Sequence, residues 1–160
     1  MSSVCISSST MRARAITFVF LASTLFCCQA APVDRHGGSD VHCPLNVKIL
    51  DALKGAPAGN VALTIFRQGV DQTWEKLSSG NTNIAGEVHE LLSEQDFKPG
   101  VYRVVFDTKT YWKGEGRTSF HEAAEVVFEA HAEGHRHYTL ALLLSPFSYT
   151  TTAVVGKEHD

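Results

Sequence analysis

The fold is decided by the stretch YTLALLLSPFSYTTTAVV, which occupies residues 138–155. Two uncharged segments, residues 138–144 and 149–155, flank a short turn that contains Pro146, and this pattern predicts a β-hairpin. Successive side chains of a strand point to opposite faces. One face of the hairpin therefore carries small, apolar or hydroxyl side chains: Thr139, Ala141, Leu143, Thr150, Thr152 and Val154. A face without charge predicts a covered surface, which would be either a subunit interface or the wall of a ligand site.

Short β-prone segments separated by turns precede the hairpin. They are residues 45–50, 61–67, 74–77, 87–91, 100–107 and 124–130. Residues 108–114 are expected to form one short helix. Together with the hairpin these segments amount to about eight strands, and strands at such spacing with turns between them are typical of an all-β sandwich or barrel.

The N-terminal region is predicted to be a secretory signal covering residues 1–30. Arg12 and Arg14 precede an apolar run at 15–28, which is too short to span a membrane. Met1 and Met11 both remain candidate starts. A flexible polar tail is expected at 31–42, followed by one domain at 43–156 and a short tail at 157–160. The mature chain is then expected to be soluble and extracellular.

Composition excludes several functional classes. The formal net charge is −3, and there is neither a basic stripe for nucleic acid nor a polybasic patch for a membrane surface. No cofactor motif is present, since Gly114-Glu115-Gly116 lacks the third glycine of a dinucleotide loop. Of four cysteines, only Cys43 lies outside the predicted signal. It is expected to be a free thiol or to form a mixed or intermolecular disulfide.

Five blocks of the chain resemble the transthyretin family. They are CPLNVKILDA at 43–52, FDTKTYWK at 106–113, FHEAAEVVF at 120–128, LLSPFSY at 143–149 and TTAVV at 151–155. The blocks occur in order and at the expected spacing. The resemblance therefore extends from Cys43 to Val155, which is nearly all of the predicted mature chain.

The resemblance implies an eight-stranded, two-sheet β-sandwich that assembles into a secreted homotetramer, a dimer of dimers, and carries thyroxine or triiodothyronine in plasma. The hormone sites would lie in a central channel between dimers. Carried over by position, the channel wall consists of Lys48, Leu50, Glu87, Thr139, Ala141, Leu142, Leu143, Thr150, Thr152 and Val154. Lys48 and Glu87 would lie at the mouth, where they could pair with the carboxylate and ammonium of an amino-acid ligand.

The resemblance also includes a second family with the same fold, the hydrolases of 5-hydroxyisourate. Hydrolysis of that compound is therefore the main alternative function. That family ends in Tyr-Arg-Gly-Ser and places His and Arg in the channel. This chain ends in Gly156-Lys157-Glu158-His159-Asp160 and has Lys48 and Glu87 at the matching channel positions. Without a positioned base and a cationic partner, we predict that the chain is not an enzyme.

Metal binding and a protein partner are two further alternatives. The eight histidines are His36, His42, His89, His121, His131, His135, His137 and His159. None of their spacings is a recognised zinc motif, so no metal site is assigned. The resemblance also implies retinol-binding protein as a partner on the loop at 114–118. Arg117 stands there in place of an expected apolar residue, and burying an unpaired charge would weaken that association.

Overall fold

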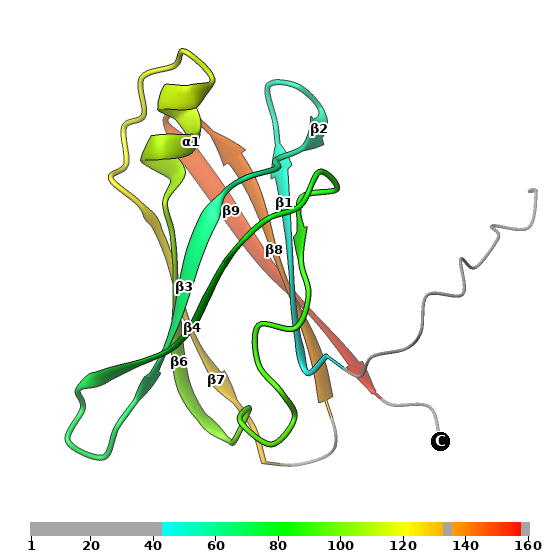
Figure 1. Ribbon diagram of the computed structural model, residues 1–160, viewed down its shortest axis with the longest axis vertical. Helices are drawn as coiled ribbons and strands as arrows, with labels where there is room; N and C mark the ends of the chain where they lie inside the picture. The colour runs from blue at the N-terminus through cyan, green and yellow to red at the C-terminus, as the bar shows by residue number, and fades with distance from the viewer. Residues whose placement is uncertain (1–42, 133–135, 158–160) are drawn as a thin grey trace, which may run out of the picture. The chain divides into compact units, whose positions relative to one another are not determined.

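The computed structural model describes residues 43–132 and 136–157 of the chain. These residues form two stacked β-sheets and one short helix (Figure 1). The predicted signal at 1–30 and the tail at 31–42 lie outside the described residues. Of the tail at 157–160, only the backbone of Lys157 is described, and it ends the last strand.

The first sheet carries the C-terminal hairpin. Its strands are β1 (Leu45–Asp51), β2 (Ala56–Pro57), β5 (Glu87–Val88), β8 (Arg136–Ser145) and β9 (Ser148–Lys157). The order is β2-β1-β8-β9, and β5 also pairs with β1. The β1–β8 pair is parallel and the other pairs are antiparallel. This order makes β9, the second strand of the hairpin, an edge strand of the sheet.

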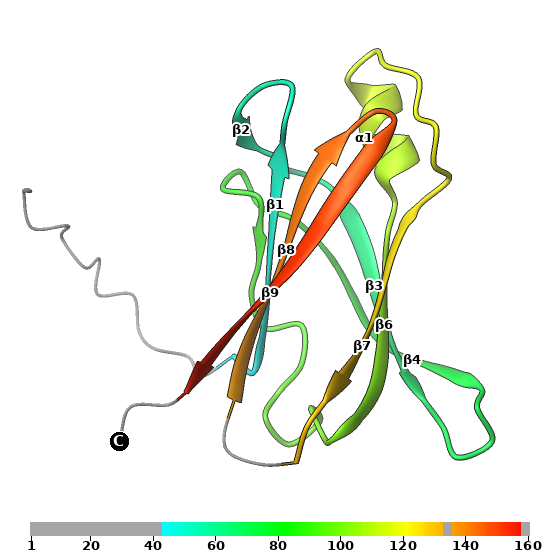
Figure 2. The same cartoon turned by 180° about the vertical axis from the view of Figure 1, so that it is seen from behind.

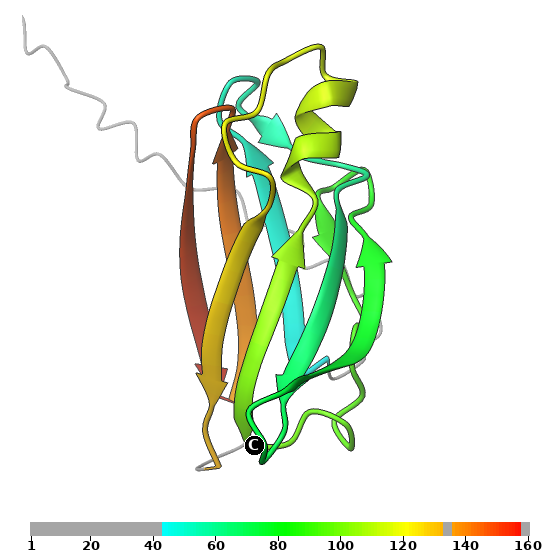
Figure 3. The ribbon, with the colours of Figure 1, turned by 90° about the vertical axis from the view of Figure 1, so that its left-hand side faces the viewer.

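The second sheet is antiparallel throughout. Its strands are β3 (Ala62–Gln68), β4 (Trp74–Asn81), β6 (Gly100–Phe106) and β7 (Ala124–Ala130), in the order β4-β3-β6-β7. The helix α1 (Thr108–Gly114) follows β6. Asp107 caps its N-terminus by accepting a hydrogen bond of 3.0 Å from the Thr110 backbone N–H, as short polar side chains do at that position. Figure 3 shows the two sheets face to face, with α1 at one end.

The core lies between the sheets because apolar residues alternate along both. On β1 the buried side chains are Leu45, Val47 and Ile49. The largest fully buried side chains elsewhere include Ile65, Tyr102, Val104, Phe106, Trp112, Leu142 and Leu144. The predicted all-β sandwich with one short helix is thereby confirmed. Within the described residues it has nine strands, two of which contain only two residues.

Two details differ from the predicted elements. The strand expected at 87–91 ends at Val88, because Glu90 has a positive φ of 60° and Leu91 and Leu92 turn into the core. The two-residue strand β2 was not predicted. It pairs with β1, and the Ala58 backbone N–H next to it donates to the Ile49 carbonyl oxygen at 2.9 Å. Gly86 approaches the same oxygen closely, since a Cβ atom at this residue would lie only 2.3 Å from it. Gly86 also has a φ of +72°, so glycine suits this position for two independent reasons.

A buried carboxylate connects the end of β1 to the helix. Asp51 is only 1% exposed. Its side chain accepts hydrogen bonds from the backbone N–H groups of Leu53 and Lys54, at 2.8 and 3.0 Å, and from the Tyr111 hydroxyl at 2.7 Å. Burial, followed by this bond to Asp51, raises the pKa of Tyr111 above its usual value. The tyrosine therefore stays a neutral donor, and α1 is tied to the first sheet.

Candidate ligand-binding face

The strand register gathers the predicted site residues on one face of the first sheet. Between β8 and β9, Thr139 pairs with Val154, Ala141 with Thr152, and Leu143 with Thr150. On the other side of β8, Lys48 of β1 lies opposite Ala141, and Leu50 lies opposite Leu143. Since residues paired across neighbouring strands point to the same face, these residues form one continuous surface. We call this surface, together with Glu87 of β5, the hairpin face (Figure 2).

The apolar side chains of the hairpin face are open to solvent in the single chain. Leu143 is 43% exposed and Val154 is 59% exposed, and Leu50 is similarly open. The β8 and β9 part of the hairpin face has no charged side chain, whereas the outer face of the second sheet carries charge along its central strand β6. There the Arg103 guanidinium stacks over the rings of Phe66 and Trp74, at 4.9 and 4.7 Å from their centroids. This difference between the two outer faces supports the prediction that the hairpin face is covered by a subunit or a ligand when the protein functions.

Leu142 is the one predicted channel residue that does not lie on the hairpin face. Its side chain is 2% exposed and belongs to the core between the sheets. The reason is the alternation of side chains along β8, which points Ala141 and Leu143 outward and Leu142 inward. The hairpin face therefore comprises nine of the ten predicted residues: Lys48, Leu50, Glu87, Thr139, Ala141, Leu143, Thr150, Thr152 and Val154.

An ion pair lies at one margin of the hairpin face. The Lys48 Nζ atom is 2.7 Å from Glu87 Oε1 and also donates to the Ala85 carbonyl oxygen at 2.7 Å. The two side chains are 32% and 33% exposed. The hydrogen bond from Lys48 lowers the pKa of Glu87, against the opposing effect of burial. Glu87 therefore carries its charge at neutral pH, and the pair lies within reach of solvent.

His89 was not among the predicted site residues. Its Nε2 atom lies 3.1 Å from Glu87 Oε2, so the Glu87 carboxylate has a partner on each oxygen. One signal for this contact was present in the sequence, because residues i and i+2 of an extended segment lie on the same side. Val88, between them, points into the core.

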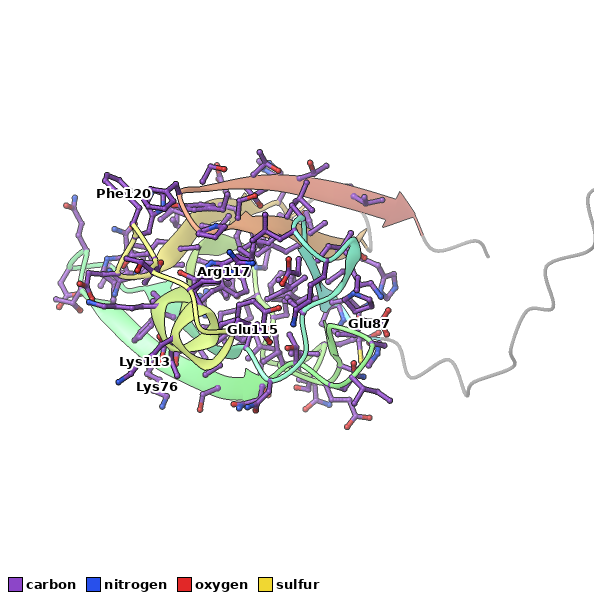
Figure 4. The ribbon with its side chains drawn as sticks, turned by 90° about the horizontal axis from the view of Figure 1, so that it is seen from above. Lys76, Glu87, Lys113, Glu115, Arg117 and Phe120 are labelled. Atoms are coloured by element: carbon purple, nitrogen blue, oxygen red, sulfur yellow. The ribbon has the colours of Figure 1, made fainter. Side chains whose placement is uncertain are left out.

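Two exposed aromatic rings lie at the hairpin turn, away from the ion pair. Phe120 and Phe147 are 69% and 67% exposed, and their ring centroids are 6.1 Å apart. The Phe120 backbone N–H donates to the Pro146 carbonyl oxygen at 2.8 Å, which fixes the loop to the turn. In the view from above, Phe120 and Glu87 lie on opposite sides of the domain (Figure 4). Sequence reasoning did not include these rings in the site.

A second open surface lies at the side where the two sheets end. The edge strands β9 and β7 lie on the same side of the sandwich (Figure 3). Between them is a mostly apolar hollow of about 330 Å³, whose lining includes Leu45, Phe128, Tyr138, Leu140, Thr151 and Val155. Apolar side chains of both sheets are therefore open to solvent along this side.

The histidines do not form a metal centre in the part of the chain that the structure describes. Over 43–132 and 136–157, no three His, Cys, Asp or Glu side chains lie close enough to hold an ion. His36, His42, His135 and His159 lie outside these ranges. The Nδ1 atom of His137 is 3.0 Å from the Cys43 carbonyl oxygen, and the Cys43 thiol is free and buried. His121 lies between rings, with centroids 4.9 Å from Phe120 and 5.1 Å from Tyr149.

The topology and the hairpin face together define a β-sandwich of the transthyretin type. The model of the HIUase/Transthyretin family matches residues 45–152, and the chain belongs to this family. It is similar to sea bream transthyretin, solved in complex with thyroxine, with 64% identity and a TM-score of 0.70. That match covers 74% of this chain and 100% of the sea bream chain. A second structure, of transthyretin from Sparus aurata, shows 63% identity over 72% of this chain and 99% of the other, also with a TM-score of 0.70.

No helix in the described ranges is long and apolar enough to cross a membrane.

Proposed function

We propose that this protein is a secreted carrier of thyroid hormone. The observation that carries the proposal is the hairpin face, where an apolar surface with hydroxyl groups is bordered by a Lys–Glu ion pair. A relative with 64% identity was crystallised with thyroxine, which supports the same ligand class here. Iodinated aromatic rings suit Leu50, Leu143 and Val154 through dispersion and burial.

The ion pair suits the polar end of such a ligand. Thyroxine and triiodothyronine carry an amino-acid carboxylate and ammonium. Lys48 would meet the carboxylate and Glu87 the ammonium, each in a charge-assisted hydrogen bond. The hydroxyls of Thr150 and Thr152 would supply neutral donors and acceptors along the wall.

Two open surfaces support assembly as a homotetramer, a dimer of dimers. Edge strands β7 and β9 have unpaired backbone groups on one side, and pairing with a second copy would satisfy them. The hairpin face would then meet its counterpart from another dimer, which encloses a channel and covers the exposed apolar side chains. A symmetric channel of this kind would contain two equivalent ligand sites.

The proposal is tested by the native mass of the purified protein with and without labelled thyroxine. Light scattering at micromolar concentration should give the mass of four chains, and the label should elute with that species. A monomeric mass would contradict the assembly. A tetramer that retains no labelled thyroxine or triiodothyronine would contradict the hormone site.

Lys48→Ala is expected to weaken thyroxine binding by about 0.5–1 kcal/mol, the usual contribution of a partly solvated ion pair. Competition with labelled thyroxine at neutral pH measures the change. Lys76→Ala is the matched control, because Lys76 is an exposed lysine on β4 of the other sheet. Figure 4 shows Lys76 on a different side of the domain from Glu87. Equal losses for both variants would mean that Lys48 has no specific role.

We infer further that the protein does not catalyse hydrolysis. The described arginine side chains, Arg67, Arg103 and Arg117, lie on the other sheet or in the loop after α1. The hairpin face therefore has no described His–Arg pair to act as base and cationic stabiliser. Turnover of 5-hydroxyisourate is expected to equal the spontaneous rate in an absorbance assay. A rate that grows with protein concentration would support the hydrolase alternative.

Association with retinol-binding protein would have a specific requirement. Arg117 is exposed in the loop after α1, where its backbone N–H donates to the Trp112 carbonyl oxygen at 2.8 Å. A partner that covers this loop needs an acidic group for the guanidinium, since burying it unpaired would be costly.

A further inference from the structure

The Glu87 carboxylate is held from two sides. Lys48 Nζ contacts Oε1 at 2.7 Å, and His89 Nε2 contacts Oε2 at 3.1 Å. Lys48 is itself fixed by a second hydrogen bond, to the Ala85 carbonyl oxygen. His89 is more than half exposed and contributes no side chain to the core, so its contact with Glu87 is separable from folding.

This arrangement leaves defined bonding positions for a ligand. An ammonium group has three N–H donors, and two of those on Lys48 are used by Ala85 and Glu87. The third is available to a ligand carboxylate. An ionised carboxylate has about four acceptor positions, so Glu87 retains some after its bonds to Lys48 and His89. These remaining positions are available to a ligand ammonium.

The orientation of Glu87 decides whether the ammonium can be recognised. A carboxylate with one partner is free to rotate about its bond to the side chain while Oε1 keeps its single bond to Lys48. That rotation would turn Oε2 away from the position that a ligand ammonium needs, whereas the third Lys48 donor would still be open to a ligand carboxylate. The second contact, from His89, opposes the rotation by engaging Oε2.

We propose that His89 is a positioning residue for ligand selection: it holds Glu87 as an acceptor for an ammonium group and so favours amino-acid ligands over carboxylates that lack the ammonium. The inference rests on the proposed function of the hairpin face and adds the basis of its ligand preference. The groups concerned are about one third or more exposed, so solvent limits the effect to a few-fold.

The test compares two ligands that share one iodinated ring system. One is thyroxine, and the other is its deaminated analogue, which has a carboxylate and no ammonium. Binding of both is measured at pH 8, where an ordinary histidine is neutral, so that only hydrogen bonding is altered. The proteins are the wild type, His89→Leu and His89→Gln. Glutamine keeps an N–H donor near the position of Nε2, whereas leucine has none.

His89→Leu is expected to weaken thyroxine binding by about three- to fivefold and to leave binding of the deaminated analogue within about twofold of wild type. His89→Gln should restore most of the preference for thyroxine. Native mass and thermal unfolding of the variants should match the wild type.

Equal losses for both ligands, an unchanged preference in His89→Leu, or a glutamine variant that behaves like the leucine variant would each overturn the role of His89. These results leave the hormone site itself intact, since the wild type would still bind both ligands. A wild-type protein that binds neither ligand would instead overturn the proposed function and this inference together.

Discussion

Leu143→Glu is expected to abolish thyroxine binding and to reduce the tetramer to smaller species. Leu143 is 43% exposed in the single chain and lies between Leu50 and Thr150 on the hairpin face. In the proposed assembly this face is buried, so each channel would gain unpaired carboxylates. Burying a charge without a partner costs several kcal/mol, so we expect at least about 3 kcal/mol, or more than a hundredfold in affinity.

Light scattering and retention of labelled thyroxine measure the two effects. Val70→Glu is the matched control, because Val70 is fully exposed in the turn between β3 and β4. It introduces the same charge away from both proposed interfaces and should leave mass and binding unchanged. A tetrameric, hormone-binding Leu143→Glu protein would show that the hairpin face is not enclosed between subunits.

Asp51→Ala is expected to cause the largest loss of folding stability among single side-chain truncations at this end of the sandwich. It would leave the buried Tyr111 hydroxyl without its acceptor and would remove the acceptor of two partly buried backbone N–H groups, those of Leu53 and Lys54. The unsatisfied buried hydroxyl costs about 1–3 kcal/mol and the two partly buried N–H groups add to this loss, so the total should be about 3 kcal/mol. Urea unfolding at one fixed protein concentration measures it, because the proposed assembly would also contribute to stability.

Tyr111→Phe provides the comparison. It removes one hydrogen bond and leaves Asp51 bound to the backbone of Leu53 and Lys54, so we expect about 1–2 kcal/mol. The order of the two effects tests the assignment. A Tyr111→Phe variant as unstable as Asp51→Ala would place the main contribution in the tyrosine and not in the carboxylate.

The sequence predicted the helix and the strands whose bounds are set by residues close together in the chain. The helix at 108–114 and the strand at 124–130 have the predicted bounds. The helix begins after a capping aspartate, and the strand alternates between exposed and covered side chains. The hairpin was also recognised, because its uncharged segments flank a proline-containing turn.

What was missed depends on how segments pack against one another. Strand β2 contains only Ala56 and Pro57 and is defined by its pairing with Leu50 and Asp51 of β1. Leu142 was assigned to the ligand face by position from the family resemblance, whereas the alternation along residues 138–144 had already placed only Thr139, Ala141 and Leu143 on that face. Phe120 and Phe147 were missed for the same kind of reason as β2. An exposed aromatic ring cannot be told from a buried one until the loop is placed against the hairpin turn.

Because β7 and β9 lie at the same side of the sandwich, a single chain released by dilution of the protein would expose both edge strands. In the proposed tetramer the subunits are held together by mass action, so a lower concentration would release single chains even when each is correctly folded. Such a chain presents two unsatisfied rows of N–H and C=O groups, and the row on β9 between Tyr149 and Val155 includes no charged or proline residue to block a new neighbour. Polymerisation should therefore begin from dissociated subunits, and a ligand that binds only the assembled form should slow it.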